Sequence, residues 1–190
     1  RKPREWQMQG KVTSDTRRAA VGELQYEYNR NAQGEWRHTL TLGTELRPTS
    51  AVRVQLQPQY TRQWDVDQYV TDLRDPRATA TYGGRWVFGD LDQSELSVET
   101  RVEWTFSPTL TLQLWAQPFV ASGRFSRFKE FTTPGRFDFA VYGRDRGTVT
   151  RAGAGGGLVV DPDGSGPAPS FAIAEQDFLV RSLRGNAVVR

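Results

Sequence analysis

Residues 95–120 read ELSVETRVEWTFSPTLTLQLWAQPFV, and this stretch decides the fold that we predict. Apolar and polar residues alternate strictly up to the turn sequence Ser107-Pro108-Thr109, and the alternation resumes after it. The apolar positions include Leu96, Val98, Val102, Trp104, Phe106, Leu110, Leu112, Leu114, Ala116 and Val120. Such period-two alternation predicts a β-hairpin. Each limb is longer than the roughly 5–6 residues usual in soluble sheets and fits the roughly 9–11 residues of a tilted strand that crosses a bilayer.

The same alternation recurs along most of the chain, separated by connections of two lengths. Further strands are predicted over residues 4–13, 20–28, 36–46, 52–64 and 182–190. Short turns fall near Ser14, Gln33, Pro48 and Pro108, whereas long loops are predicted at 65–94 and 123–174. Short turns on one side and long loops on the other are typical of outer-membrane barrels. We therefore predict an all-β fold, an antiparallel up-and-down transmembrane β-barrel in the bacterial outer membrane, with the long loops extracellular.

Composition is compatible with this prediction. The mean hydropathy of −0.62 is low, as it is in a barrel whose strands alternate lipid-facing and lumen-facing residues. No run approaches the roughly 18 apolar residues of a helical span. The chain of 190 residues has no cysteine, which excludes disulfides and thiolate metal sites. Its net charge of +3 is scattered, which disfavours nucleic acid as a partner.

Both chain ends influence the predicted domain organisation. The first ten residues contain neither an initiator methionine nor an apolar signal segment, and residues 187–190 stop within an alternating pattern. We therefore expect residues 1–190 to be a single barrel segment, truncated at both ends, of a larger barrel.

The registers of three hairpins follow from placing apolar residues opposite apolar ones. This rule places Trp104 opposite Leu112, Glu45 opposite Arg53, and Tyr28 opposite Trp36. Glu27 then lies opposite Arg37, so two opposite-charge pairs fall on the polar face.

Each face carries a set of candidate functional residues. The charged candidates on the predicted lumen face are Arg37, Glu45, Arg53, Glu95, Glu99, Arg101 and Glu103. They would either fill a narrow barrel with ion pairs or line an aqueous passage, depending on strand number. The candidate membrane-interface aromatics are Tyr28, Trp36, Tyr60 and Trp64 at the outer end and Trp104 and Phe106 at the inner end. Bilayers select aromatic residues at both interfaces.

The segment from Gln68 to Phe131, QYVTDLRDPRATATYGGRWVFGDLDQSELSVETRVEWTFSPTLTLQLWAQPFVASGRFSRFKEF, resembles an uncharacterised bacterial family, domain of unknown function 5916. DFLVRSLRGNAVVR at the end of the chain resembles its continuation. The resemblance covers about residues 49–190. It implies an outer-membrane barrel, often preceded by a β-sandwich similar to carbohydrate-binding family 9. It implies no catalytic residue, and this chain lacks the sandwich, so sugar binding does not transfer to its residues.

Catalytic and metal chemistry receive little support from the sequence. His38 is the only histidine, and any serine triad would have to use it; it falls on the apolar face, where an interfacial role is favoured. Glu99 and Glu103 could be spaced for glycoside hydrolysis, although alternation alone places them. The predicted loops contain the acidic pairs Asp65 and Asp67, Asp90 and Asp92, and Asp161 and Asp163. None completes a calcium-loop motif, so solvated acids are favoured over metal ligands, and no cofactor is expected.

The sequence thus predicts an outer-membrane β-barrel protein for passage or surface binding of a ligand, with carbohydrate as a candidate ligand. Outer-membrane lipid is its expected partner, and an enzyme is the less favoured reading. Two alternatives stay open: a surface hydrolase carried on a barrel, and a soluble β-sandwich adhesion module.

Overall fold

The computed structural model describes residues 4–153 and 156–190, which fold into two compact units. Unit 1 comprises Arg1–Trp64, Gln93–Gly123 and Phe178–Arg190, and unit 2 comprises Asp65–Asp92 and Arg124–Asp177. The only helix among the described residues is the 3-10 turn η1 (Thr79–Thr81). No helix in the described part of the chain has the length and apolar character needed to cross a membrane.

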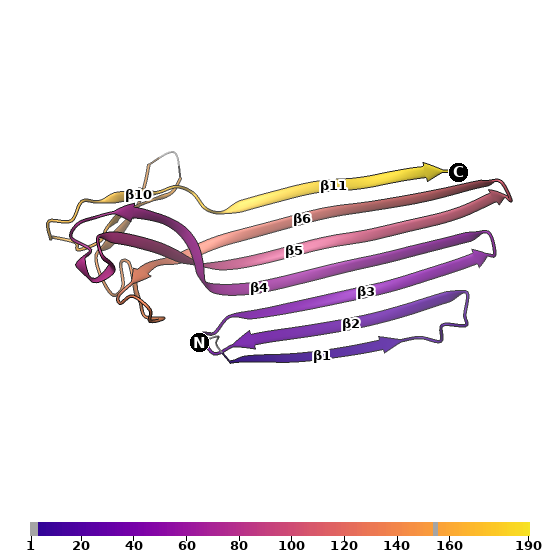
Figure 1. Ribbon diagram of the computed structural model, residues 1–190, viewed down its shortest axis with the longest axis horizontal. Helices are drawn as coiled ribbons and strands as arrows, with labels where there is room; N and C mark the ends of the chain where they lie inside the picture. Colours follow the sequence, from indigo (N-terminus) through magenta and orange to yellow (C-terminus); the bar gives the residue numbers. More distant parts are fainter. Residues whose placement is uncertain (1–3, 154–155) are drawn as a thin grey trace. The chain divides into compact units, whose positions relative to one another are not determined.

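Unit 1 is a large antiparallel up-and-down sheet. Its strands are β1 (Glu5–Thr13), β2 (Ala20–Asn31), β3 (Trp36–Thr49), residues 52–64 of β4 (Val52–Arg74), residues 93–107 of β5 (Gly84–Ser107), residues 110–123 of β6 (Leu110–Phe131) and β11 (Phe178–Val189). The remaining residues of β4, β5 and β6 belong to unit 2. They lie side by side in the order β1-β2-β3-β4-β5-β6-β11, as Figure 1 shows. The long alternating strands and the short turns that join them are confirmed. The sheet is not closed, however, because within residues 4–153 and 156–190 β1 pairs only with β2, and β11 only with β6.

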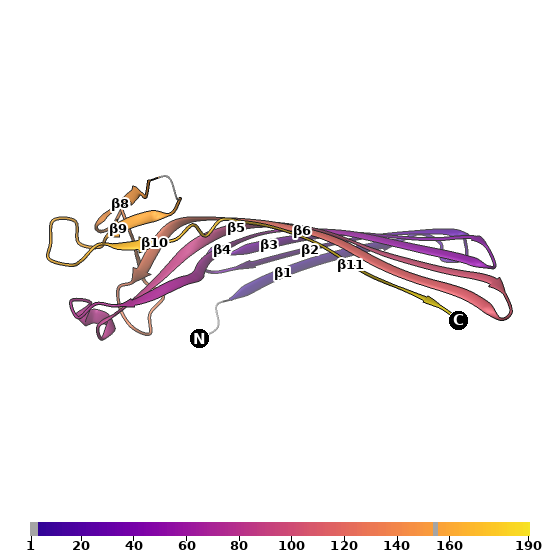
Figure 2. The same cartoon turned by 90° about the horizontal axis from the view of Figure 1, so that it is seen from above.

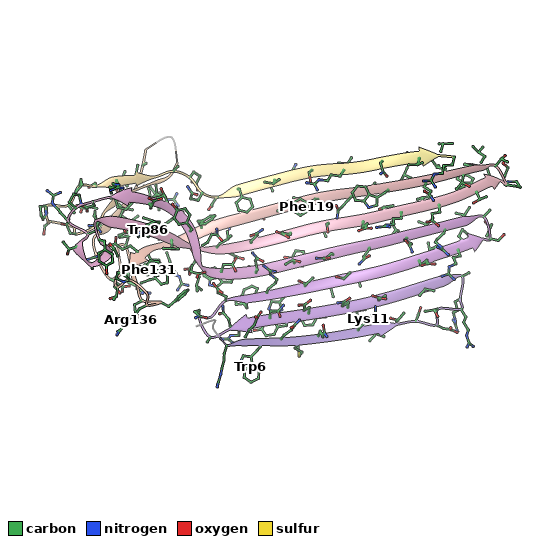
Figure 3. All side chains as sticks on the ribbon, viewed as in Figure 1. Trp6, Lys11, Trp86, Phe119, Phe131 and Arg136 are labelled. Atoms are coloured by element: carbon green, nitrogen blue, oxygen red, sulfur yellow. The ribbon has the colours of Figure 1, made fainter. Side chains whose placement is uncertain are left out.

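The strands of unit 1 form one layer, which Figure 2 shows from its edge. Large apolar side chains on one face remain partly open, as with Leu24 and Leu42, each 45% exposed. Trp6 on the edge strand β1 projects away from the sheet (Figure 3) and is 74% exposed. Unit 1 therefore lacks a buried core comparable with that of unit 2 within the described residues.

Two of the three predicted registers are wrong by two residues. Tyr28 lies opposite His38 rather than Trp36, and Glu45 lies opposite Gln55 rather than Arg53. A shift of two preserves which residues share a face, so the predicted faces are unaffected. For the third hairpin, the hydroxyls of Ser94 and Ser122 lie 3.1 Å apart, which agrees with continuing the predicted pairing along β5 and β6.

The stretches predicted as long loops contain strands in the structure. Strand β4 continues to Arg74 and β5 begins at Gly84, so the first stretch is mainly a hairpin. The second contains the end of β6 and four short strands: β7 (Phe139–Val141), β8 (Thr148–Arg151), β9 (Leu158–Asp161) and β10 (Phe171–Ile173). Strand β7 pairs with β6, and β8, β9 and β10 form a separate sheet in the order β10-β9-β8.

Unit 2 has its own apolar core, which explains why these residues are ordered into strands. The fully packed members are Val87, Tyr142, Val160 and Ile173. Val70 and Leu73 of β4 and Phe128 of β6 pack against this core. Burial of apolar side chains from distant segments thus converts the expected loops into a folded unit.

Candidate functional site

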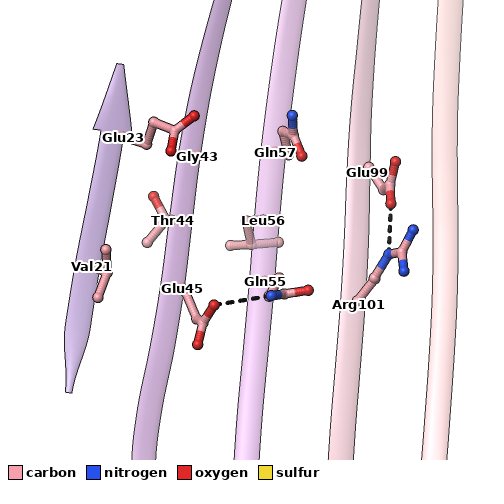
Figure 4. A pocket seen from close by; sticks show the side chains of 10 residues that line it. All are labelled: Val21, Glu23, Gly43, Thr44, Glu45, Gln55, Leu56, Gln57, Glu99 and Arg101. Carbon is pink, nitrogen blue, oxygen red and sulfur yellow. Dashed lines mark hydrogen bonds and ion pairs between the residues drawn. The ribbon is translucent and has the colours of Figure 1, made fainter. Parts of the chain in front are cut away.

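A shallow hollow lies on the polar face of unit 1, where β2, β3, β4 and β5 run side by side. It has a volume of about 290 Å³. Figure 4 shows Glu23, Glu45, Gln55, Gln57, Glu99 and Arg101 projecting into it from these strands. Because successive residues of a strand point to opposite faces, the period-two sequence pattern by itself gathers these polar groups on one face.

Each carboxylate of the hollow has a polar partner. Glu99 accepts a hydrogen bond from Arg101 at 2.7 Å, and Glu45 accepts one from Gln55 at 3.0 Å. Lys11 of β1 forms an ion pair with Glu23 at 2.8 Å. The hollow therefore offers paired charges and amide groups, which suit hydrogen bonding to a polar solute.

The other charged candidates extend this network along the same face. Arg53 lies 3.5 Å from Glu45 and 3.6 Å from Glu103, so one arginine bridges two strands. Glu95 accepts a hydrogen bond from Gln93 at 2.5 Å. Arg37 is exposed opposite Asn29 of β2 and Gln63 of β4, instead of the predicted Glu27. Whether this face lines a lumen stays a prediction.

The two carboxylates considered for glycoside hydrolysis form ion pairs with different arginines. Glu99 pairs with Arg101, whereas Glu103 pairs with Arg53. Each is thus committed to a different arginine, and no shared substrate position follows from these contacts.

The aromatic candidates lie on the apolar face of unit 1, in two groups. Trp36 and Trp64 are direct partners across β3 and β4, and Tyr60 lies opposite Leu40 on the same strands. Beside the turn between β5 and β6, Trp104 and Phe106 stack with ring centroids 4.4 Å apart.

His38 belongs to the first aromatic group rather than to a triad. Its Nδ1 lies 2.6 Å from the hydroxyl of Tyr26. Its ring lies 4.6 Å from that of Tyr28 and 5.0 Å from that of Trp36. These contacts to three aromatic residues offer no serine nucleophile.

The acidic residues predicted in loops have other roles in the structure. No group of three or more potential metal-ligating His, Asp or Glu side chains occurs in the described ranges. Asp65 and Asp67 lie within β4, and Asp90 and Asp92 within β5. Asp90 is fully buried and forms ion pairs with Lys129, at 2.6 Å, and Arg127.

The last acidic pair stabilises a turn. The carboxylate of Asp161 accepts a hydrogen bond from the backbone N–H of Gly164 at 3.0 Å. Asp163 accepts one from the N–H of Ala168 at 2.9 Å. Local backbone capping accounts for both residues.

Unit 2 contains a second set of charged residues, which were not among the residues predicted to be functional. The guanidinium of Arg85 donates to Asp75 at 2.8 Å and to both carboxylate oxygens of Glu130 at 2.8 Å. The three side chains are only 6%, 1% and 4% exposed, respectively. Arg146 also bonds Glu130. Charge-assisted hydrogen bonds of this kind are among the stronger polar contacts in proteins.

Hydrogen bonding and burial shift the pKa values of three groups in this part of unit 2. The backbone N–H of Arg77 and then the Arg85 guanidinium lower the pKa of Asp75. Burial alone would lower the pKa of Arg85, but Asp75 and Glu130 outweigh it and raise that pKa. Burial, with a smaller effect of Glu130, raises the pKa of Tyr142. The network thus keeps Asp75 and Arg85 charged and the Tyr142 phenol neutral.

One local signal of this network is visible in the sequence. Asp75-Pro76-Arg77 forms a turn in which the Asp75 carboxylate accepts the N–H of Arg77 at 2.9 Å, as Asp commonly does before a turn. The pairing of Arg85 with Glu130, 45 residues apart, leaves no such signal.

Comparisons with protein-family models, curated proteins and solved structures found no match. The resemblance to the uncharacterised outer-membrane family therefore stays a prediction.

Proposed function

We propose that unit 1 is the lipid-facing wall of an outer-membrane β-barrel, and that the protein serves passage or surface binding of a ligand, with carbohydrate as a candidate. The long loops of that proposal correspond to unit 2, which would be extracellular. The polar face of unit 1 would then face the lumen.

The observation that carries the proposal is the uncovered apolar face of unit 1. The residues with the largest open apolar side chains on this face include Leu24, Leu40, Leu42, Tyr60, Leu96, Trp104 and Phe106, each 39–50% exposed. Soluble monomers rarely leave contiguous apolar patches larger than a few hundred Å² in water. A hydrocarbon environment on this side of the sheet removes the free-energy cost of exposing apolar side chains to water. The opposite face, in contrast, carries many charged and amide side chains.

The two aromatic groups support the same orientation. The group around Trp36, Trp64 and His38 and the stacked pair of Trp104 and Phe106 lie at opposite ends of the strands of unit 1. Amphipathic rings favour the headgroup regions on both sides of a bilayer.

The free edges of β1 and β11 support closure by further strands. Seven strands follow one another in this sheet within the described residues, so β1 and β11 point in the same direction. Joining them directly would require a parallel pair, which an up-and-down antiparallel barrel does not contain. An odd number of additional strands would close the sheet, and it would also protect two edges that otherwise favour aggregation.

Flotation with lipid vesicles tests the proposed location. After dilution from denaturant into vesicles, the chain is expected to float with the lipid and to resist extraction by high salt and alkaline carbonate. The soluble β-sandwich alternative predicts a monodisperse chain in the aqueous phase without detergent. That result would contradict the proposal.

A further inference from the structure

A small hollow in unit 2 has an excess of positive charge on its wall. Its volume is about 170 Å³, and the residues that matter for the inference are Arg77, Thr79, Arg85, Glu130, Phe131 and Arg146. They come from the connection between β4 and β5, from the start of β5, from the end of β6 and from the segment after β7. Figure 3 labels Phe131 in this part of the chain.

The acidic groups beside this hollow are already neutralised. Arg85 forms ion pairs with the carboxylates of both Asp75 and Glu130. Glu130 forms a second ion pair, with Arg146. Three guanidinium groups therefore face two carboxylates, which leaves one net positive charge.

Two of the guanidinium groups keep donors for a ligand. Arg77 is exposed and uses its backbone N–H on Asp75, while its guanidinium forms no hydrogen bond to another described residue. Arg146 is 45% exposed and engages Glu130 through only one of its nitrogens. An arginine has five N–H donors in a planar fork, so most of the donors of both residues stay available.

Arg146 is held in one position, unlike a mobile arginine on the protein surface. The Glu130 side chain is 4% exposed, and both of its carboxylate oxygens accept hydrogen bonds from Arg85. The carboxylate that binds Arg146 is therefore fixed in position. Phe131 forms an apolar wall beside it, stacked on Phe139 with centroids 4.6 Å apart. The hollow thus combines a preorganised cation, a second cation, the hydroxyl of Thr79 and an aromatic surface.

We propose that this hollow binds a phosphate-type oxyanion, either free or as the phosphomonoester of a sugar. Guanidinium forks match the oxygens of phosphate, and such charge-assisted bonds are stronger than neutral ones. The Phe131 ring would pack against the sugar of a phosphomonoester. The inference goes beyond the proposed function because it rests on unit 2 alone, and it holds whether or not unit 1 faces lipid.

Calorimetric titration of the full chain, in phosphate-free buffer at low ionic strength, tests this site. The probes are inorganic phosphate and glucose 6-phosphate, and saturable binding at one site is expected for both. Tighter binding of glucose 6-phosphate identifies a phosphomonoester as the ligand class, whereas equal affinities identify the phosphate group alone. Because Arg77 and Arg146 are partly exposed, added salt is expected to weaken binding.

Three single substitutions make the test specific to the hollow. Arg77→Gln and Arg146→Gln are each expected to weaken binding at least about fivefold, since each removes a charged donor. Arg151→Gln, an exposed residue of β8 outside the hollow, is the matched control and should change affinity less than about twofold. If Arg146→Gln disturbs folding through Glu130, Arg77→Gln still tests the site, because the Arg77 guanidinium forms no hydrogen bond within the described part of the chain. Absence of saturable binding, or equal losses in Arg77→Gln and Arg151→Gln, would overturn the proposal.

Discussion

Arg85→Met is expected to destabilise unit 2 by about 3–5 kcal/mol, the usual cost of breaking a buried ion pair from one side. The substitution leaves the carboxylates of Asp75 and Glu130 buried without their main cation. Asp75 keeps the N–H of Arg77, and Glu130 keeps Arg146, so some compensation remains. Trp86 is the only tryptophan in unit 2, so the fluorine resonance of Trp86 in fluorotryptophan-labelled protein can follow its unfolding in urea.

Two further variants separate a buried-charge effect from a general loss of packing. Arg144→Met removes an exposed ion pair with Asp145 and should cost less than about 1 kcal/mol. The triple variant Asp75→Asn, Arg85→Met, Glu130→Gln removes the stranded charges and is expected to recover more than half of the loss. A triple variant less stable than Arg85→Met alone would show that the charges are not the cause.

Leu42→Arg is expected to destabilise the lipid-embedded chain by about 2–4 kcal/mol, as charged substitutions do on the lipid face near the bilayer midplane. Leu42 lies near the middle of β3, opposite Leu24 of β2, on the apolar face. Thr41 is its neighbour on the polar face, opposite Gln25 and Gln59. Urea titration in lipid vesicles measures the free energy of unfolding of Leu42→Arg and of a control variant at Thr41.

The matched control for this prediction is Thr41→Arg, which places the same side chain one residue away on the other face. Its expected cost is about 0.5 kcal/mol or less, because the polar face already accommodates charges. Equal costs of the two substitutions would mean that the faces do not meet different environments.

The hairpins of unit 1 were predictable because alternation fixes which residues share a face. The register of strand pairing was harder to predict, because a shift by two residues leaves every side chain on the same face of the sheet. In the β2–β3 hairpin the turn determines the register. The Asn31 side chain accepts hydrogen bonds from the backbone N–H groups of Gln33 and Glu35, both at 3.0 Å, and these bonds fix how β2 pairs with β3. In the β3–β4 hairpin, an irregularity between Leu46 and Thr49 shifts the pairing of the two strands.

Unit 2 escaped prediction because its order depends on contacts between distant residues. Its short strands of three or four residues are too brief for alternation to be recognised. Val87 and Val160 meet in the same core although 73 positions separate them in the sequence. The Asp75–Arg85–Glu130 network depends on the same assembly, so only its turn at Asp75 was locally encoded.

The central claim is that the two faces of unit 1 meet lipid and water respectively, and a spin-label scan along β3 tests it most directly. The chain has no native cysteine, so single cysteines at residues 37–46 can each be labelled uniquely. In lipid vesicles, accessibility to oxygen is expected to peak at His38, Leu40, Leu42, Thr44 and Leu46, and accessibility to a water-soluble nickel chelate at the residues between them. Accessibility to the chelate at both sets of positions, without a period of two, would contradict the account.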